Sequence, residues 1–144
     1  MNRELNIMLI EDDTSVCKRF AEYVDIIPDI SIMAVTNNSY RALELIQECL
    51  PDAIILDLEL NQGKGNGLLF LQELNTLSIP FKPFILITTN NSSTITYDYA
   101  RQLGADFIMS KHQEDYSEKS AIDFLQMMKA VSYTHLRAHE TVLD

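Results

Sequence analysis

The stretch Ala53-Ile54-Ile55-Leu56-Asp57 is a short apolar run that ends in an acid. Runs this short and this apolar are typical of strands buried on both faces, as in a parallel sheet covered by helices. Other runs of the same form end in polar side chains: residues 7–10 before Glu11-Asp12-Asp13, residues 84–87 before Thr88-Thr89, and residues 107–109 before Ser110-Lys111. Parallel strands end along one edge of a sheet, where open α/β sheets bind ligands. We therefore expect these polar groups to gather in one crevice.

Segments with helical periodicity alternate with the apolar runs. The pattern predicts strands at 6–10, 30–35, 53–57, 84–88 and 106–109, and helices at 14–27, 39–50, 68–77, 94–102 and 117–130. A loop at 58–66 contains Gly63, Lys64 and Gly65. Strict alternation with short connections predicts a doubly wound, flavodoxin-like α/β fold, with a five-stranded parallel sheet in the order 2-1-3-4-5.

Length and charge restrict the class of protein. A chain of 144 residues is long enough for one domain with a real core. Its net charge of −10 argues against direct binding to nucleic acid. The apolar stretches are far shorter than the roughly 18 residues that suggest a membrane span. Met1–Leu5 lacks the basic-then-apolar pattern of a signal peptide, so we expect a cytoplasmic protein without membrane contact.

The last residues, 131–144, do not continue the pattern of the rest of the chain. We expect residues 1–130 to form the domain. We expect residues 131–144 to be a tail that is foreign to the natural protein, or a sign that the chain is cut before an effector domain.

The acids at the strand ends predict a metal site. Glu11 and Asp12 follow the first strand and Asp57 ends the third, and these strands are neighbours in the expected order. Three converging carboxylates repel one another unless a cation lies among them. Oxygen ligands suit Mg²⁺. Each acid taken singly is more often a helix cap or a solvated loop residue.

The same set of residues favours phosphoryl transfer. A carboxylate beside Mg²⁺ can attack phosphorus and form an aspartyl phosphate. The metal and the Lys111 ammonium would offset charge on the phosphoryl oxygens, and the Thr88 hydroxyl could donate to one of them. Taken singly, Thr88 is ordinary strand-end polarity and Lys111 a surface lysine.

From residue 6 to about residue 129, the chain resembles the response-regulator receiver domain of two-component signalling. The motifs are Ile-Glu-Asp-Asp at 10–13, Ile-Ile-Leu-Asp-Leu at 54–58, Leu-Ile-Thr-Thr at 86–89, and Gly-Ala-Asp at 104–106 followed by Lys111. The resemblance implies that Asp57 is phosphorylated, that Glu11, Asp12, Asp57 and the main-chain carbonyl of Glu59 hold Mg²⁺, and that Thr88 and Lys111 bind the phosphoryl group. It also implies a histidine kinase or phosphotransfer protein as donor.

Departures from the family pattern concern signal transmission more than phosphorylation. The loop after Asp57 lacks the usual Met-Pro and is longer. Ile108 stands where the family usually has an aromatic switch residue, with Phe107 one place early. Thr89 is larger than the usual Ala or Gly, and His112 replaces the common Pro after Lys111.

The leading hypothesis is a phosphoacceptor switch, not an enzyme, which acts on a partner or a transcriptional effector domain and homodimerises through residues 94–130. One alternative is a degenerate receiver that only binds proteins. A second is a hydrolase of the haloacid dehalogenase type, for which Asp57-Leu58-Glu59 gives only a loose match. The hypothesis of a flavodoxin-like nucleotide-binding protein has still less support, because Gly63-x-Gly65-x-Gly67 is no phosphate-loop pattern.

Overall fold

The computed structural model describes residues 4–60 and 66–143, with side chains described up to residue 130. The predicted glycines and lysine at 63–65 lie outside the described residues. Strands and helices alternate along the chain in the order β1 Leu5–Ile10, α1 Thr14–Asp25, β2 Ile30–Thr36, α2 Ser39–Cys49, β3 Ala53–Asp57, α3 Gly67–Leu74, β4 Phe84–Thr89, α4 Thr94–Gln102, β5 Phe107–Ser110 and α5 Glu118–Leu143.

The five strands form one parallel sheet in the order β2-β1-β3-β4-β5, which confirms the predicted topology. In the registers of the central strands, Ile10 pairs with Leu56, and Asp57 pairs with Thr88. The acids that follow β1 and the Asp57 that ends β3 therefore lie at neighbouring strand ends, with the end of β4 next to them.

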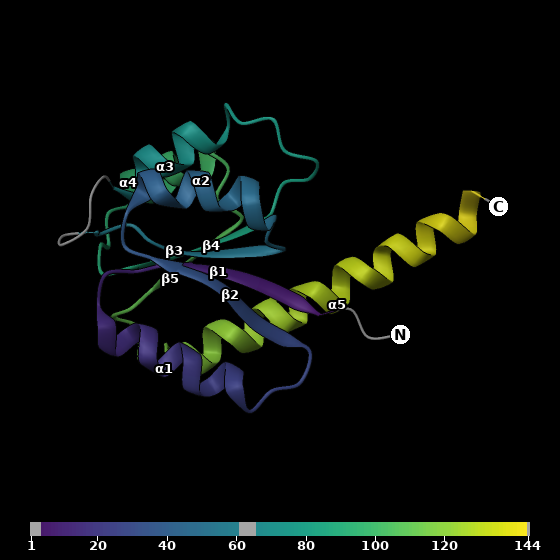
Figure 1. Cartoon of the computed structure of the whole chain (residues 1–144), viewed down its shortest axis with the longest axis horizontal. Helices are drawn as coiled ribbons and strands as arrows, with labels where there is room; N and C mark the ends of the chain where they lie inside the picture. Colours follow the sequence, from purple (N-terminus) through teal and green to yellow (C-terminus); the bar gives the residue numbers. More distant parts are fainter. Residues whose placement is uncertain (1–3, 61–65, 144) are drawn as a thin grey trace.

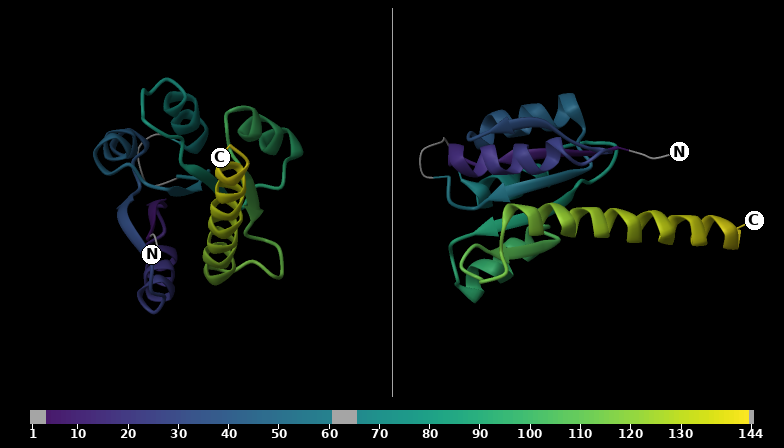
Figure 2. Two further views of the ribbon diagram at one scale, coloured as in Figure 1. Left: turned by 90° about the vertical axis from the view of Figure 1, so that its right-hand side faces the viewer. Right: turned by 90° about the horizontal axis from the view of Figure 1, so that it is seen from below.

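Helices cover both faces of the sheet (Figure 1). Helices α1 and α5 lie on one face and α2, α3 and α4 on the other, and Figure 2 shows the same layers from two further directions. Each face has its own apolar core. Phe20 of α1 and Ile122 of α5 pack in one core, while Ile46 of α2, Phe70 of α3 and Ala100 of α4 pack in the other.

A capping side chain and two glycines explain several helix boundaries. Asp13 caps α1 by accepting hydrogen bonds from the N–H groups of Ser15 and Val16. Gly104 follows α4 with a φ of +107°, a conformation that favours glycine after a helix. At Gly67, an added Cβ would lie 2.8 Å from the Leu58 Cα, so the start of α3 can approach the end of β3 only with glycine there.

Two predicted helix ends are wrong by three residues or more, and the predicted end of α1 at residue 27 lies two residues beyond Asp25. Helix α3 ends at Leu74 rather than Leu77, because the chain tightens into short turns in which Thr76 and Leu77 donate to carbonyls three residues back. Helix α5 continues past residue 130 to Leu143, and no glycine or proline interrupts that segment. Its last turns project beyond the end of the sheet (Figure 1).

Among the described residues, no helix combines the length and the apolar composition that a membrane span requires.

Candidate functional site

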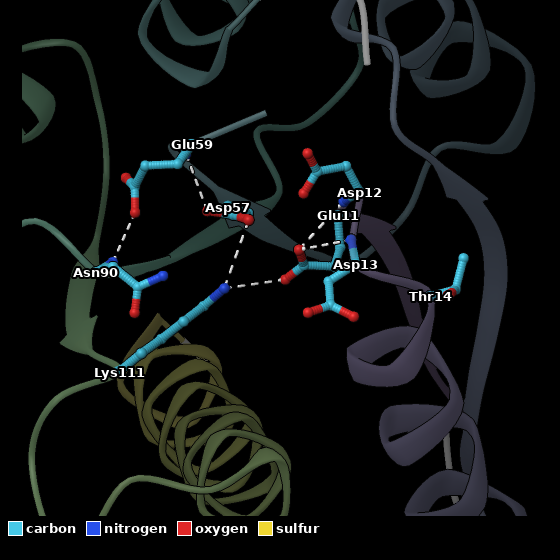
Figure 3. A pocket seen from close by; sticks show the side chains of 8 residues that line it. All are labelled: Glu11, Asp12, Asp13, Thr14, Asp57, Glu59, Asn90 and Lys111. Carbon is cyan, nitrogen blue, oxygen red and sulfur yellow. Dashed lines mark hydrogen bonds and ion pairs between the residues drawn. The ribbon is translucent and has the colours of Figure 1, made fainter. Parts of the chain in front are cut away.

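The C-terminal edge of the sheet carries a crevice of about 360 Å³, and five of its lining residues are acids. Figure 3 shows the lining, which comes from the segment after β1, the end of β3, the loop after β4 and the loop after β5. The lining residues are Glu11, Asp12, Asp13, Thr14, Asp57, Glu59, Asn90 and Lys111.

Three carboxylates converge in this crevice. Glu11, Asp12 and Asp57 each offer an oxygen, and these oxygens lie within 4.8 Å of one another. Glu11 and Asp57 are 3% and 4% exposed, so little solvent screens their charges. Glu11 Oε2 also accepts hydrogen bonds from the N–H groups of Asp12 and Asp13, which fixes its carboxylate against the turn after β1.

Lys111 reaches into the same crevice from the loop after β5. Its Nζ lies 3.1 Å from Glu11 Oε1 and 3.4 Å from Asp57 Oδ2 (Figure 3). Its main-chain N–H donates to the Thr89 carbonyl at 2.8 Å, which anchors the base of the side chain to β4. Burial lowers the pKa of Lys111, but the charges of Asp57 and Glu11 outweigh that effect and raise it, so the ammonium stays charged.

Without a metal ion, the negative charge of an ionised Asp57 carboxylate is poorly balanced. Burial, together with the neighbouring Glu11, raises the pKa of Asp57 to about 8. A hydrogen bond from the Glu59 N–H, at 2.9 Å from Asp57 Oδ1, and the Lys111 charge act in the opposite direction. One ammonium is therefore too little positive charge for this cluster.

Thr88 lies beside Asp57 but makes no hydrogen bond with it. The two residues pair in the register of β3 and β4. Thr88 is 1% exposed, and its Oγ1 is buried without a hydrogen-bond partner. A buried hydroxyl without a partner is costly, so the end of β4 carries a donor that only an additional acceptor would satisfy.

Glu59 enters the site through its side chain as well as its backbone. Its carboxylate accepts hydrogen bonds from the Thr89 hydroxyl and from the Asn90 N–H, both at 2.6 Å. Sequence reasoning assigned Glu59 only a main-chain carbonyl and did not include Asn90. The position of Asn90, directly after the polar end of β4, was an available signal for that residue, whereas no pattern pointed to the Glu59 side chain.

The structure brings together all the residues that the sequence singled out. Glu11, Asp12, Asp57, Glu59 and Lys111 line one crevice, and Thr88 lies buried beside Asp57. The residues fit Mg²⁺, because an all-oxygen donor set holds more negative charge than Lys111 can balance. Glu11, Asp12 and Asp57 would hold such an ion.

Comparisons with known proteins agree with this geometry. The response regulator receiver domain family matches residues 7–123. A protein-glutamate methylesterase/protein-glutamine glutaminase of Rhizobium johnstonii is 27% identical over 139 residues, which cover 95% of this chain and 37% of that protein. The chain thus spans less than two-fifths of the length of this relative.

Solved structures with the same fold include other receiver domains. The response regulator domain of Thermotoga maritima CheB has a TM-score of 0.71 at 17% identity, over 89% of this chain and 96% of that domain. A DNA-binding response regulator of the LuxR family from Staphylococcus aureus has a TM-score of 0.72 at 20% identity, over 85% of this chain and 97% of the other. These similarities concern the fold. The family match covers most of the sequence and carries the assignment: this chain belongs to the response regulator receiver domain family.

Proposed function

We propose that this domain is a Mg²⁺-dependent phosphoacceptor switch of the cytoplasm, phosphorylated at Asp57 by a histidine kinase or a phosphotransfer protein. Glu11, Asp12, Asp57 and the main-chain carbonyl of Glu59 would hold the ion. Thr88 and Lys111 would bind the phosphoryl oxygens. The domain would assist only its own phosphorylation and dephosphorylation, as a signalling module rather than an enzyme.

The chemistry follows from the residues in the crevice. An ionised Asp57 oxygen attacks phosphorus, a new O–P bond forms, and the N–P bond of the phosphohistidine breaks, so that the imidazole nitrogen keeps the electron pair. Bound Mg²⁺ would neutralise negative charge on the transferring group. Lys111 would shift its ammonium from Asp57 Oδ2, 3.4 Å away, to a phosphoryl oxygen.

The unpartnered Thr88 hydroxyl is the observation that supports this proposal most. It is buried next to Asp57 in the adjacent strand, where ordinary packing would place an apolar side chain. A phosphoryl group on Asp57 would supply the acceptor that this hydroxyl lacks. A degenerate receiver would have no need for this donor, for Lys111, or for the full set of acids.

Proteins of two different kinds suggest which effector this domain acts on. The Staphylococcus aureus neighbour is a DNA-binding response regulator, and we propose a transcriptional effector, or a separate partner protein, as the target. The Rhizobium johnstonii relative is a methylesterase, which makes a methylesterase effector the second candidate. The acidic receiver itself would not contact DNA.

Phosphorylation from acetyl phosphate tests the assignment directly. Wild-type protein with Mg²⁺ should gain one labile phosphoryl group, seen as a mass increase that disappears on mild alkaline treatment. Asp57→Asn should gain none, because an amide oxygen is a poor nucleophile, while its circular dichroism spectrum stays that of the wild type.

Asp13→Asn is the matched control, because Asp13 lines the same crevice and an Asn can still cap α1. This variant should still be labelled. Labelling of Asp57→Asn at the wild-type level would refute Asp57 as the acceptor. Labelling of the wild type in the presence of excess chelator would refute the dependence on Mg²⁺.

A further inference from the structure

The Glu59 side chain connects the two loops that flank Asp57. Glu59 Oε2 accepts a hydrogen bond from Thr89 Oγ1, and Oε1 accepts one from the Asn90 N–H, both at 2.6 Å. Figure 3 shows the Glu59 side chain pointing toward Asn90 and away from Glu11 and Asp12. Hydrogen bonds to a carboxylate are stronger than those between neutral groups. We call these two bonds the Glu59 latch.

Both ends of the Glu59 latch are tied to the phosphoacceptor site. At one end, the Glu59 N–H donates to Asp57 Oδ1 at 2.9 Å. At the other end, Thr89 is fully buried, and its carbonyl accepts from the Lys111 N–H at 2.8 Å. A change of charge at Asp57 therefore acts on residues that are bonded to the latch.

The latch holds a segment whose own hydrogen bonding is incomplete. Thr88 precedes Thr89, and its buried Oγ1 has no partner. That unsatisfied donor favours any movement that finds it an acceptor. The hydrogen bonds to Glu59 hold Thr89 and Asn90 in place. The end of β4 therefore stays in a position where the Thr88 hydroxyl has no acceptor.

The latch also connects to α4. Thr89 Oγ1, while donating to Glu59, accepts from the Asn91 N–H at 2.9 Å. The Asn91 carbonyl accepts from the Tyr97 hydroxyl at 2.6 Å, and Asn91 Oδ1 accepts from the Ser93 N–H at 2.7 Å. Movement of Thr89 would therefore be passed to the first turn of α4.

We propose that the Glu59 carboxylate is a positioning group, which holds the loop after β4 in its unphosphorylated arrangement and opposes the engagement of Thr88 with a phosphoryl group on Asp57. This inference rests on the proposed phosphoacceptor function and adds a residue that sets its switching equilibrium. A phosphoryl group carries about −1.5 to −2 charges and would replace the single charge of the Asp57 carboxylate, so the added negative charge would repel Glu59 and release the latch. A protein that must first break the latch binds a phosphoryl mimic more weakly than one without it.

Thr89→Val removes the latch hydroxyl without changing an acid or the side-chain volume. With Mg²⁺ at saturation, its affinity for beryllofluoride should rise roughly three- to ten-fold, the factor that one net hydrogen bond supplies. Thr89→Ser keeps the hydroxyl and should bind as the wild type does. In protein without beryllofluoride, the Asn90 amide should exchange its hydrogen faster in Thr89→Val than in Thr89→Ser.

Glu59→Ala provides a second way to cut the latch if Thr89→Val does not fold. Because it also removes a negative charge near an anionic ligand, its affinity is compared with that of Asp13→Asn, which removes a charge from the same crevice and keeps the latch. Glu59→Ala should gain more affinity than Asp13→Asn. If both single variants fold, their effects should not add in the double variant Glu59→Ala/Thr89→Val.

Each outcome decides the proposal. If the wild type binds beryllofluoride and Thr89→Val binds it with equal or lower affinity, the proposed role of the latch is wrong. The phosphoacceptor role would then remain intact. Equal gains in Glu59→Ala and Asp13→Asn, or Thr89→Ser behaving like Thr89→Val, would also overturn it. A wild type that binds no beryllofluoride would overturn the phosphoacceptor function and this inference with it.

Discussion

At the scale of single residues, the buried carboxylate of Asp57 links stability to pH. Burial raises the pKa of Asp57 from 3.8 to about 8 in the folded, Mg²⁺-free protein. An acid with a raised pKa holds more protons folded than unfolded between these values, so the contribution of Asp57 to the free energy of unfolding should fall as the pH rises from about 4 to 8. Asp57→Asn lacks this proton and should melt several degrees above the wild type at pH 8.

The difference in thermal midpoint between wild type and Asp57→Asn isolates this residue, because other titrating groups are common to both. That difference should widen steadily from pH 4 to pH 8 in the presence of a chelator. Mg²⁺ should reduce it, since the ion stabilises the ionised carboxylate. Midpoints that run parallel over the whole range would contradict a proton bound at Asp57.

Sequence reasoning reached the charged residues of the site but not their contacts. Glu11, Asp12, Asp57 and Lys111 were predictable because strand ends in a parallel sheet share one edge. The pairing of Glu59 with Thr89 was not, because it depends on side-chain conformations in two loops that no periodicity encodes. The sequence showed Thr89 only as a residue larger than expected at its position.

At the scale of secondary-structure elements, the junction of β3 and α3 depends on Gly67. A Cβ at this position would lie 2.8 Å from the Leu58 Cα and 3.1 Å from the Asp57 carbonyl oxygen. Gly67→Ala should lower the free energy of unfolding by about 1–3 kcal/mol through overpacking. It should also slow labelling by acetyl phosphate, because the backbone that must shift carries the nucleophile.

Gly104→Ala is the comparison for this effect. Its φ of +107° also makes an alanine strained, at a cost of about 1–3 kcal/mol, but it follows α4 away from the crevice. Denaturant unfolding should show both variants destabilised, and only Gly67→Ala should be labelled more slowly at a temperature where each is folded. Equal labelling rates would show that the β3–α3 junction does not position Asp57.

The order and type of the elements followed from the alternation of apolar runs and helical periodicity, whereas some helix ends did not. The predicted end of α3 was wrong because Thr76 and Leu77 form short local turns instead of continuing the helical hydrogen bonding. The predicted end of α5 relied on a change of composition at residue 130. Composition alone does not break a helix, and the backbone continues to Leu143.

At the scale of the whole molecule, the status of residues 131–144 can be tested by deletion. The last turns of α5 extend away from the sheet and the other helices (Figure 1). We propose that residues 1–130 form the receiver domain. Ending the chain after Ala130 should then move the thermal midpoint by no more than about 2 °C, measured by circular dichroism. A loss of several degrees would show that the tail belongs to the fold.

The switch should act through the face formed by α4, β5 and α5. Phe107 stacks on Phe124 of α5 with ring centroids 4.4 Å apart, on the sheet face opposite the core against which Ile108 packs. Ile108 has no ring to rotate and no hydroxyl to expose, so the signal should travel through backbone shifts of the loop after β4 and of α4. Ile95 and Tyr99 of α4 are 80% and 44% exposed and offer apolar surface for a second copy of the domain.

Homodimerisation should therefore depend on Thr88 and on α4 in different ways. Beryllofluoride with Mg²⁺ should shift wild-type protein toward the dimer in sedimentation velocity, a population shift between two packings. Thr88→Ala should still accept phosphate at Asp57 but lose most of this shift, because no hydroxyl draws the end of β4 toward the phosphoryl group. Ile95→Lys should keep phosphorylation and lose the dimer, because it places a charge in the apolar contact. Equal ligand-dependent dimerisation in wild type and Thr88→Ala would refute the coupling through Thr88, whereas dimerisation of Ile95→Lys at the wild-type level would place the interface elsewhere.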